Sequence, residues 1–146
     1  ARSNLMWVST LAINGLTATG KSSDWLSHKL EHTLSAYFDV THGMGLAVVH
    51  PNYLKFVYKN HLVKFRSFAI NVWNIDPEGK TDEELALESI VALQNFFKEI
   101  GAPTTLRELD IPKDKIKEMA ENTAAYKTSY SDLSTSDIET IYNNAY

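Results

Sequence analysis

Three histidines lie within a span of fifteen residues and form the part of the sequence best suited to chemistry. His28 and His32 stand four residues apart in the segment HKLEH, and His42 follows in THG. Residues four apart on a helix lie on one face, one turn apart, so these two rings can share a small volume. His42 lies past a turn from which the chain can fold back. Because the sequence contains no cysteine, a metal here would be held by imidazole nitrogen or by oxygen.

The same residues also admit readings without a metal. Histidines four apart are common by chance, and a surface His28 with a core-capping His32 would fit a non-enzymatic helical interaction module. Glu31 can hydrogen-bond a ligand histidine or stand solvated on a helix face, and both possibilities stay open. Gly43 and Gly45 would let the backbone pass close to a bound group. His50 and His61 are expected to be structural or exposed.

The segment HKLEH also matches the inverted zinc-metalloprotease motif, in which His28 and His32 would bind zinc and Glu31 would act as general base. Glu108 can be suggested as the third ligand. This alternative leaves His42 unexplained and requires a substrate-binding sheet that the sequence does not predict. It stays as the enzymatic alternative.

The elements around the histidines all have helical patterns, which predicts an all-α fold, a bundle of about six to seven helices. The expected helical segments are 4–14, 22–37, a segment after the turn at 39–42 that runs to about 60, 61–73, 81–100, a short turn at 105–109, 112–124 and 134–146. Residues 1–146 contain no repeat or long linker, so they are expected to form a single domain.

Three local patterns carry most of this prediction. Thr81 and Glu84 form a capping box that begins the helix 81–100, whose apolar residues repeat at helical spacing, namely Ala86, Ile90, Leu93, Phe97 and Ile100. Gly15 is expected to end the first helix, and Pro51 is expected to kink the third. The aromatic residues nearest the histidines are expected mainly in the core rather than in a substrate pocket, namely Trp7, Trp25, Tyr37 and Phe38.

Composition excludes several classes of function. The chain has 146 residues, 44% of them hydrophobic, and a formal net charge of −4 without a basic stripe, so nucleic acid is not an expected partner. No apolar run approaches the roughly 20 residues needed to span a membrane, and no signal segment opens the chain, so we expect a cytoplasmic protein. The apolar run LMWV close to a start that is not Met favours removal of upstream sequence.

The stretch HKLEHTLSAYFDVTHGMGLAVVHP, residues 28–51, resembles the iron-containing alcohol dehydrogenases, most of all their butanol dehydrogenase branch. The resemblance extends through ARSNLMWVSTLAINGL before it and through FAINVW and FFKEIGAPTTLRELDI after it, and thus covers almost the whole chain. Its specific feature is a histidine, a second four residues later and a third, followed by glycine, fourteen after the first.

The resemblance implies the C-terminal all-helical, metal-binding domain of an enzyme whose N-terminal dinucleotide-binding domain is absent from this chain. It implies His28 and His42 as metal ligands and His32 as a catalytic residue that faces nicotinamide and substrate, with an aspartate and a further histidine ligand upstream. The metal would be Fe²⁺, with Zn²⁺ as the alternative, and the coenzyme NAD or NADP. The substrate would be a small alcohol or aldehyde, butanol among them, and the full-length enzyme a homodimer. The isolated chain is expected to be inactive and to bind metal weakly.

Overall fold

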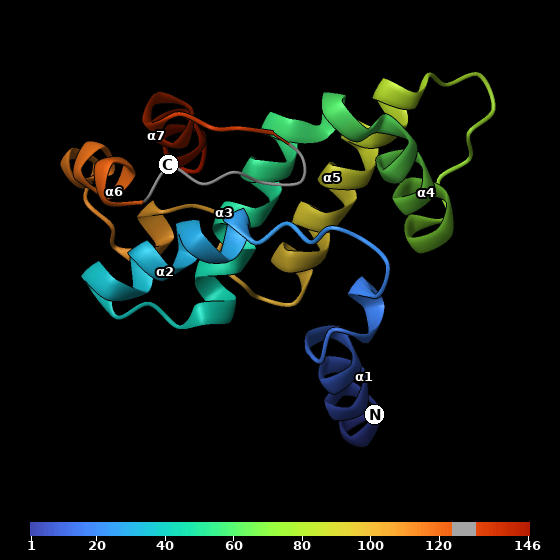
Figure 1. The fold of residues 1–146 in the computed structure, drawn as a ribbon, viewed down its shortest axis with the longest axis horizontal. Helices are drawn as coiled ribbons and strands as arrows, with labels where there is room; N and C mark the ends of the chain where they lie inside the picture. Colours follow the sequence, from blue (N-terminus) through green and yellow to red (C-terminus); the bar gives the residue numbers. More distant parts are fainter. Residues whose placement is uncertain (124–130) are drawn as a thin grey trace.

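The computed structural model describes residues 1–123 and 131–146, which form helices joined by loops (Figure 1). The α-helices of these two ranges are α1 (Arg2–Ile13), α2 (Leu26–Phe38), α3 (His42–Val57), α4 (Leu62–Trp73), α5 (Asp82–Glu99), α6 (Ile116–Asn122) and α7 (Thr135–Asn144). Short 3-10 helices are η1 (Leu16–Ala18), η2 (Tyr58–His61), η3 (Arg107–Leu109) and η4 (Lys113–Lys115). The described ranges contain no β-strand, so the all-α prediction is confirmed.

The main core lies between α2, α3, α6 and α7. Leu30 and Leu34 of α2, Val49 of α3 and Ile141 of α7 are all fully buried in it. Complete burial of an aliphatic side chain of this size contributes about 1.5–3 kcal/mol relative to exposure. The core therefore holds α2 firmly against α3, and these are the two helices that carry the three histidines.

A second, smaller apolar cluster joins α4 and α5 through Tyr58, Phe65, Ala86 and Ile90. The capping box at Thr81 is present as predicted, with Thr81 Oγ1 accepting from the Glu84 backbone N–H and the Glu84 carboxylate accepting from Thr81 N–H. The apolar face predicted for this helix is buried only in its first half. Ile100 is 60% exposed, so its assignment to the packed face is wrong.

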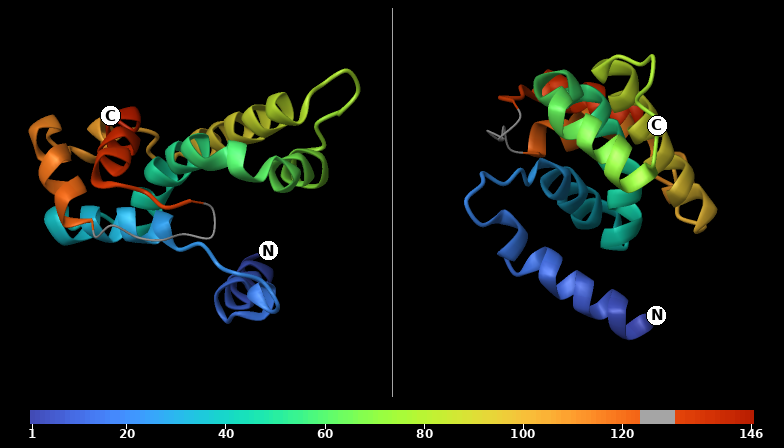
Figure 2. Two further views of the ribbon diagram at one scale, coloured as in Figure 1. Left: turned by 45° about the horizontal axis from the view of Figure 1, so that its top comes forward. Right: turned by 90° about the vertical axis from the view of Figure 1, so that its right-hand side faces the viewer.

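Helix α1 has no buried residue and extends away from the other helices, as both views of Figure 2 show. It ends before Gly15, whose φ of 86° is a left-handed conformation that glycine adopts without strain, as predicted. In the described part of the chain, no helix combines the length and apolar character that crossing a membrane requires.

Most predicted boundaries differ from the structure by one or two residues, and three differ for a reason that matters to the site or the fold. Helix α2 begins at Leu26 rather than Ser22, because Asp24 Oδ1 accepts from the Leu26 backbone N–H (2.9 Å) in a turn that precedes the helix. Helix α3 runs through Pro51 as one element and ends at Val57 rather than near residue 60. The segment expected at 112–124 starts as η4 and becomes α6, while position 124 lies outside the described residues.

Candidate metal centre

A tight reversal between α2 and α3 brings His42 back to the histidines of α2. Asp39 ends α2 with a φ of 52°, a left-handed conformation that Asp tolerates better than most residues. Only Val40 and Thr41 follow before α3 begins at His42. The packing of the two helices then sets the first turn of α3 beside the middle of α2.

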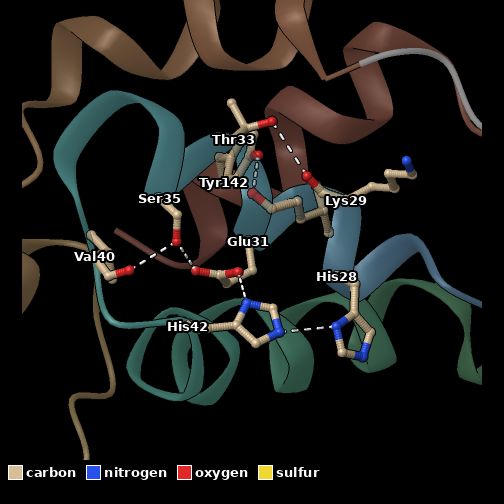
Figure 3. Close-up of polar contacts among 9 residues, drawn as sticks. His28, Lys29, Glu31, Thr33, Ser35, Val40, His42 and Tyr142 are labelled. Carbon is tan, nitrogen blue, oxygen red and sulfur yellow. Dashed lines mark hydrogen bonds and ion pairs between the residues drawn. The ribbon is translucent and has the colours of Figure 1, made fainter. Parts of the chain in front are cut away.

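The three histidine rings gather as predicted. His28 Nδ1 lies 3.1 Å from His42 Nε2 (Figure 3). The ring centroid of His42 lies 5.1 Å from that of His28 and 5.3 Å from that of His32. Each of the three offers a nitrogen, and these atoms all lie within 4.8 Å of one another. His32 and His42 are exposed and His28 is half-buried, so the cluster opens to solvent.

The separation of the His28 and His42 nitrogens suits two ligands of one ion. Two imidazole nitrogens bound to zinc at about 2.0–2.1 Å are about 3.3 Å apart at a tetrahedral angle and about 2.9 Å apart at a right angle. The observed 3.1 Å falls between these values. The donor set of imidazoles suits zinc and iron(II) alike, so a divalent metal fits these residues.

The electrostatics of the cluster favour the neutral, metal-binding form of His28. Burial lowers the pKa of His28, and the neighbouring His42 and His32 rings lower it further, although Glu31 opposes them. A neutral imidazole keeps a free lone pair on one ring nitrogen. A metal can therefore bind near neutral pH with little competition from protons at this residue.

Glu31 does not stand solvated on the helix face. Its side chain is fully buried and pairs through Oε2 with Nδ1 of His42, whereas the side chain of His42 is 46% exposed. Its other oxygen, Oε1, accepts from the Ser35 hydroxyl at 2.5 Å. Of the two roles left open by the sequence, the solvated one is therefore wrong, and the histidine that Glu31 contacts is His42.

A polar group beside the cluster had no signal in the sequence. Ser27 Oγ lies 2.8 Å from His50 Nδ1, and Tyr53 donates to Asp24. Burial lowers the pKa of His50 to about 4, so this ring stays neutral, as its predicted structural role requires. Ser27 and His50 border a pocket of about 390 Å³ that also reaches His28. The partners are 23 and 29 residues apart, so only the packing of α2 and its preceding turn on α3 reveals them.

The aromatic residues near the histidines lie on the surface more than expected. Trp25 is 44% exposed and its ring lies 5.0 Å from that of His28, and Tyr37 is 37% exposed. Tyr37 and His32 line a second pocket of about 370 Å³. Trp7 is also exposed, in α1, so the expected core role is wrong for these three residues, while Phe38 packs against the core.

Comparisons with known proteins match this chain to alcohol dehydrogenases and aldehyde reductases. The family described as "Fe-containing alcohol dehydrogenase family, C-terminal" matches residues 1–146. NADH-dependent butanol dehydrogenase A of Clostridium acetobutylicum is 42% identical to all of the chain, which spans 39% of that relative's length. An NADPH-dependent aldehyde reductase of Escherichia coli is 36% identical over an aligned region that covers 79% of this chain and 29% of the reductase.

A solved structure agrees with the sequence relatives. The crystal structure of NADH-dependent butanol dehydrogenase A of Thermotoga maritima superposes on this chain with a TM-score of 0.91 at 35% identity. The superposed region covers 99% of this chain and 38% of the Thermotoga maritima chain. The chain thus matches 29 to 39% of the length of these proteins.

Proposed function

The chain belongs to the Fe-containing alcohol dehydrogenase family, whose C-terminal part it matches, and from this premise we propose that it is the metal-binding part of an NAD(P)H-dependent enzyme. The proposed reaction interconverts short-chain primary alcohols, such as butanol, with their aldehydes. The nucleotide-binding part would lie outside these 146 residues, so the chain alone is expected to be inactive. The homodimeric state and the cytoplasmic location stay predictions.

His28 and His42 would hold the divalent metal, iron(II) or zinc, together with ligands from the rest of the enzyme. When bound, the metal supplies Lewis acidity that polarises an aldehyde oxygen or makes an alcohol proton easier to remove. The hydride belongs to the coenzyme, NADH or NADPH. Within the 146 residues, the site is uncovered on the side of His32 and His42, which leaves room there for ligands from the rest of the enzyme.

His32 would act at the substrate rather than at the metal. It is exposed and lies one helical turn from His28. The pocket that it lines with Tyr37 is large enough for a short alcohol. The imidazole would either pass the alcohol proton to solvent or orient the substrate oxygen by a hydrogen bond.

The observation that carries this proposal is the 3.1 Å separation of His28 Nδ1 and His42 Nε2, two residues fourteen positions apart that a tight reversal brings to one point. A buried carboxylate also contacts one of the two rings, since Glu31 pairs with His42.

The test uses the protein extended to its native start. Butanal-dependent oxidation of NADH and NADPH would be measured with added Fe²⁺ or Zn²⁺, together with metal content. His28→Ala and His42→Ala should lose metal and turnover, whereas His32→Ala should keep its metal and lose turnover. His61→Ala is the matched control and should match the wild type. Unchanged metal content and turnover in both His28→Ala and His42→Ala would overturn the proposal.

The inverted zinc-metalloprotease alternative has lost support because its general base must reach a water molecule at the metal. Glu31 is fully buried and already bonded to His42 and Ser35. Chelator-sensitive cleavage of peptides by the 146-residue chain would restore this alternative. A non-enzymatic helical module would instead show no metal binding and no turnover in the extended protein.

A further inference from the structure

A fully buried carboxylate lies behind the histidine cluster, and the proposed reaction does not say what it does there. Glu31 is 0% exposed. Removing a carboxylate from water costs several kcal/mol unless hydrogen bonds and opposite charge compensate. A burial of this kind is unexpected for a residue that only fills space, so we expect the contacts of Glu31 to compensate this cost.

Both oxygens of Glu31 are fixed. Oε2 pairs with Nδ1 of His42, and Oε1 accepts from Ser35 Oγ at 2.5 Å. The Ser35 hydroxyl also lies 2.8 Å from the backbone carbonyl of Val40, in the reversal between the helices. Figure 3 shows these groups as one row that runs from Val40 through Ser35 and Glu31 to His42. The carboxylate therefore links the turn that places His42 to the ring of His42 itself.

The space for Glu31 depends on a missing side chain. A Cβ atom added to Gly45 would lie 2.7 Å from Cγ and 2.8 Å from Oε1 of Glu31, closer than atoms can pack. Gly45 is itself buried in the first turn of α3. By contrast, a Cβ atom added to Gly43 would meet nothing within 4 Å. Of the two glycines beside His42, only Gly45 allows a close approach, and the group that approaches is Glu31.

We propose that Glu31 is a positioning residue that holds His42 in the tautomer with its proton on Nδ1. An ionised carboxylate only accepts hydrogen bonds, so the His42 nitrogen that faces it must donate. The proton on Nδ1 leaves a lone pair on Nε2, which in the metal-free chain accepts from His28 Nδ1 at 3.1 Å and can bind a metal instead. A carboxylate behind a ligand histidine fixes its ring orientation and raises its basicity. This inference rests on the proposed function, because it assigns Nε2 of His42 to the metal.

The first test needs no variant. Long-range ¹H–¹⁵N spectra of the 146-residue chain without metal, at about pH 8 where histidine is neutral, distinguish the two tautomers of each ring. Free histidine favours the proton on Nε2, so the Nδ1–H form at His42 is the expected result if Glu31 acts as proposed. A proton on Nε2 of His42 would overturn the inference.

The second test separates positioning from simple packing. Glu31→Met removes the acceptor but keeps the length of the side chain, whereas Glu31→Gln keeps an acceptor oxygen. Glu31→Met should mix the tautomers of His42 and weaken Zn²⁺ binding about 10- to 100-fold, and Glu31→Gln should restore most of both. Glu99→Met, at an exposed glutamate in the last turn of α5, is the matched control and should leave both unchanged.

The outcomes distinguish this inference from the proposed function. Zinc binding that is lost in His42→Ala but equal in Glu31→Met and the wild type would reject the role of Glu31 and leave the metal site intact. Absence of zinc binding in the wild type, even in the extended protein, would reject the metal site, while the His42 tautomer would still decide whether Glu31 fixes the ring. Circular dichroism of each variant verifies that it is folded, and the wild-type spectrum stays decisive if Glu31→Met does not fold.

Discussion

Helices α1 and α2 have 12 and 13 residues and both contain several large apolar side chains, but the two helices have different surroundings. In α2, the side chains of Leu26, Leu30 and Leu34 are fully buried in the main core. In α1, Leu5 is 67% exposed and Trp7 is 65% exposed. Apolar content alone therefore does not tell which of the two helices is buried within these 146 residues.

The spacing of the apolar residues also differs between the two helices. The leucines of α2 repeat every four residues and form one face, which a helix can bury against a neighbour. The apolar residues of α1 run consecutively through Leu5, Met6, Trp7 and Val8 and so point in several directions. The α2–α3 pair thus has its stabilising contacts within the described residues, and these contacts hold the histidines. We expect four effects on stability, which decrease from the core of the α2–α3 pair to α1.

The largest effect is expected in the core beneath the histidines. Leu30→Ala should lower the free energy of unfolding by about 2–5 kcal/mol, because a fully buried leucine leaves a cavity. Urea denaturation followed by circular dichroism measures this value. A loss of less than about 1 kcal/mol, close to the scale of a surface substitution, would mean that the core of α2 and α3 relaxes around the cavity.

The next effect concerns pH. Burial lowers the pKa of His50 in the folded chain to about 4, with a further contribution from His28 and an opposing one from Asp24. The unfolded state, with a histidine pKa of about 6.5, binds more protons in this interval. Stability should therefore fall as the pH drops from about 6.5 to about 4, by about 3 kcal/mol in total.

Urea denaturation at a series of pH values on the wild type and on His50→Asn tests this dependence. The difference between the two proteins isolates His50 from the other titrating groups. Parallel curves for the two proteins over the whole interval would show that His50 does not account for the loss.

A smaller pair of effects with opposite signs is expected in the first turn of α3. Gly45→Ala should destabilise the chain by about 1–3 kcal/mol, because its Cβ would collide with Glu31. Gly43→Ala should stabilise it by up to about 1 kcal/mol, because alanine is the better helix former and meets no neighbour. Thermal unfolding of both variants gives the comparison. Equal shifts of the same sign would show that Glu31 has room to move aside.

The smallest effect is expected in α1. Leu5→Ala is the same chemical change as Leu30→Ala, but at a side chain that is 67% exposed. It should change the free energy of unfolding of the 146-residue chain by no more than about 0.5 kcal/mol. The same urea titration serves as the measurement. A loss comparable to that of Leu30→Ala would show that α1 packs against the body of the chain and would remove the contrast between the two helices.

Much of the helical framework is determined locally and could be predicted from the sequence. The capping box at Thr81 begins α5 through hydrogen bonds between residues three apart, and Gly15 ends α1 through its own backbone freedom. The shared face of His28 and His32 follows from the period of a helix. Such features depend on neighbours within one or two turns, so their residue types are sufficient to identify them.

The tertiary structure decided the features that depend on partners far along the chain. Tyr53 of α3 bonds to Asp24, where a turn stands in place of the predicted helix start. The burial of Glu31 and its pairing with His42 require α3 to fold back over α2 and require Gly45 to leave room.

The sequence by itself therefore determined the family, the helices and the three histidines of the candidate site. Only the packing of α2 on α3 decided which ring nitrogens face each other and which carboxylate stands behind them. The physical reason is that helix signals arise from hydrogen bonds within a few residues. The environment of a buried charge is set instead by every element that excludes water from it.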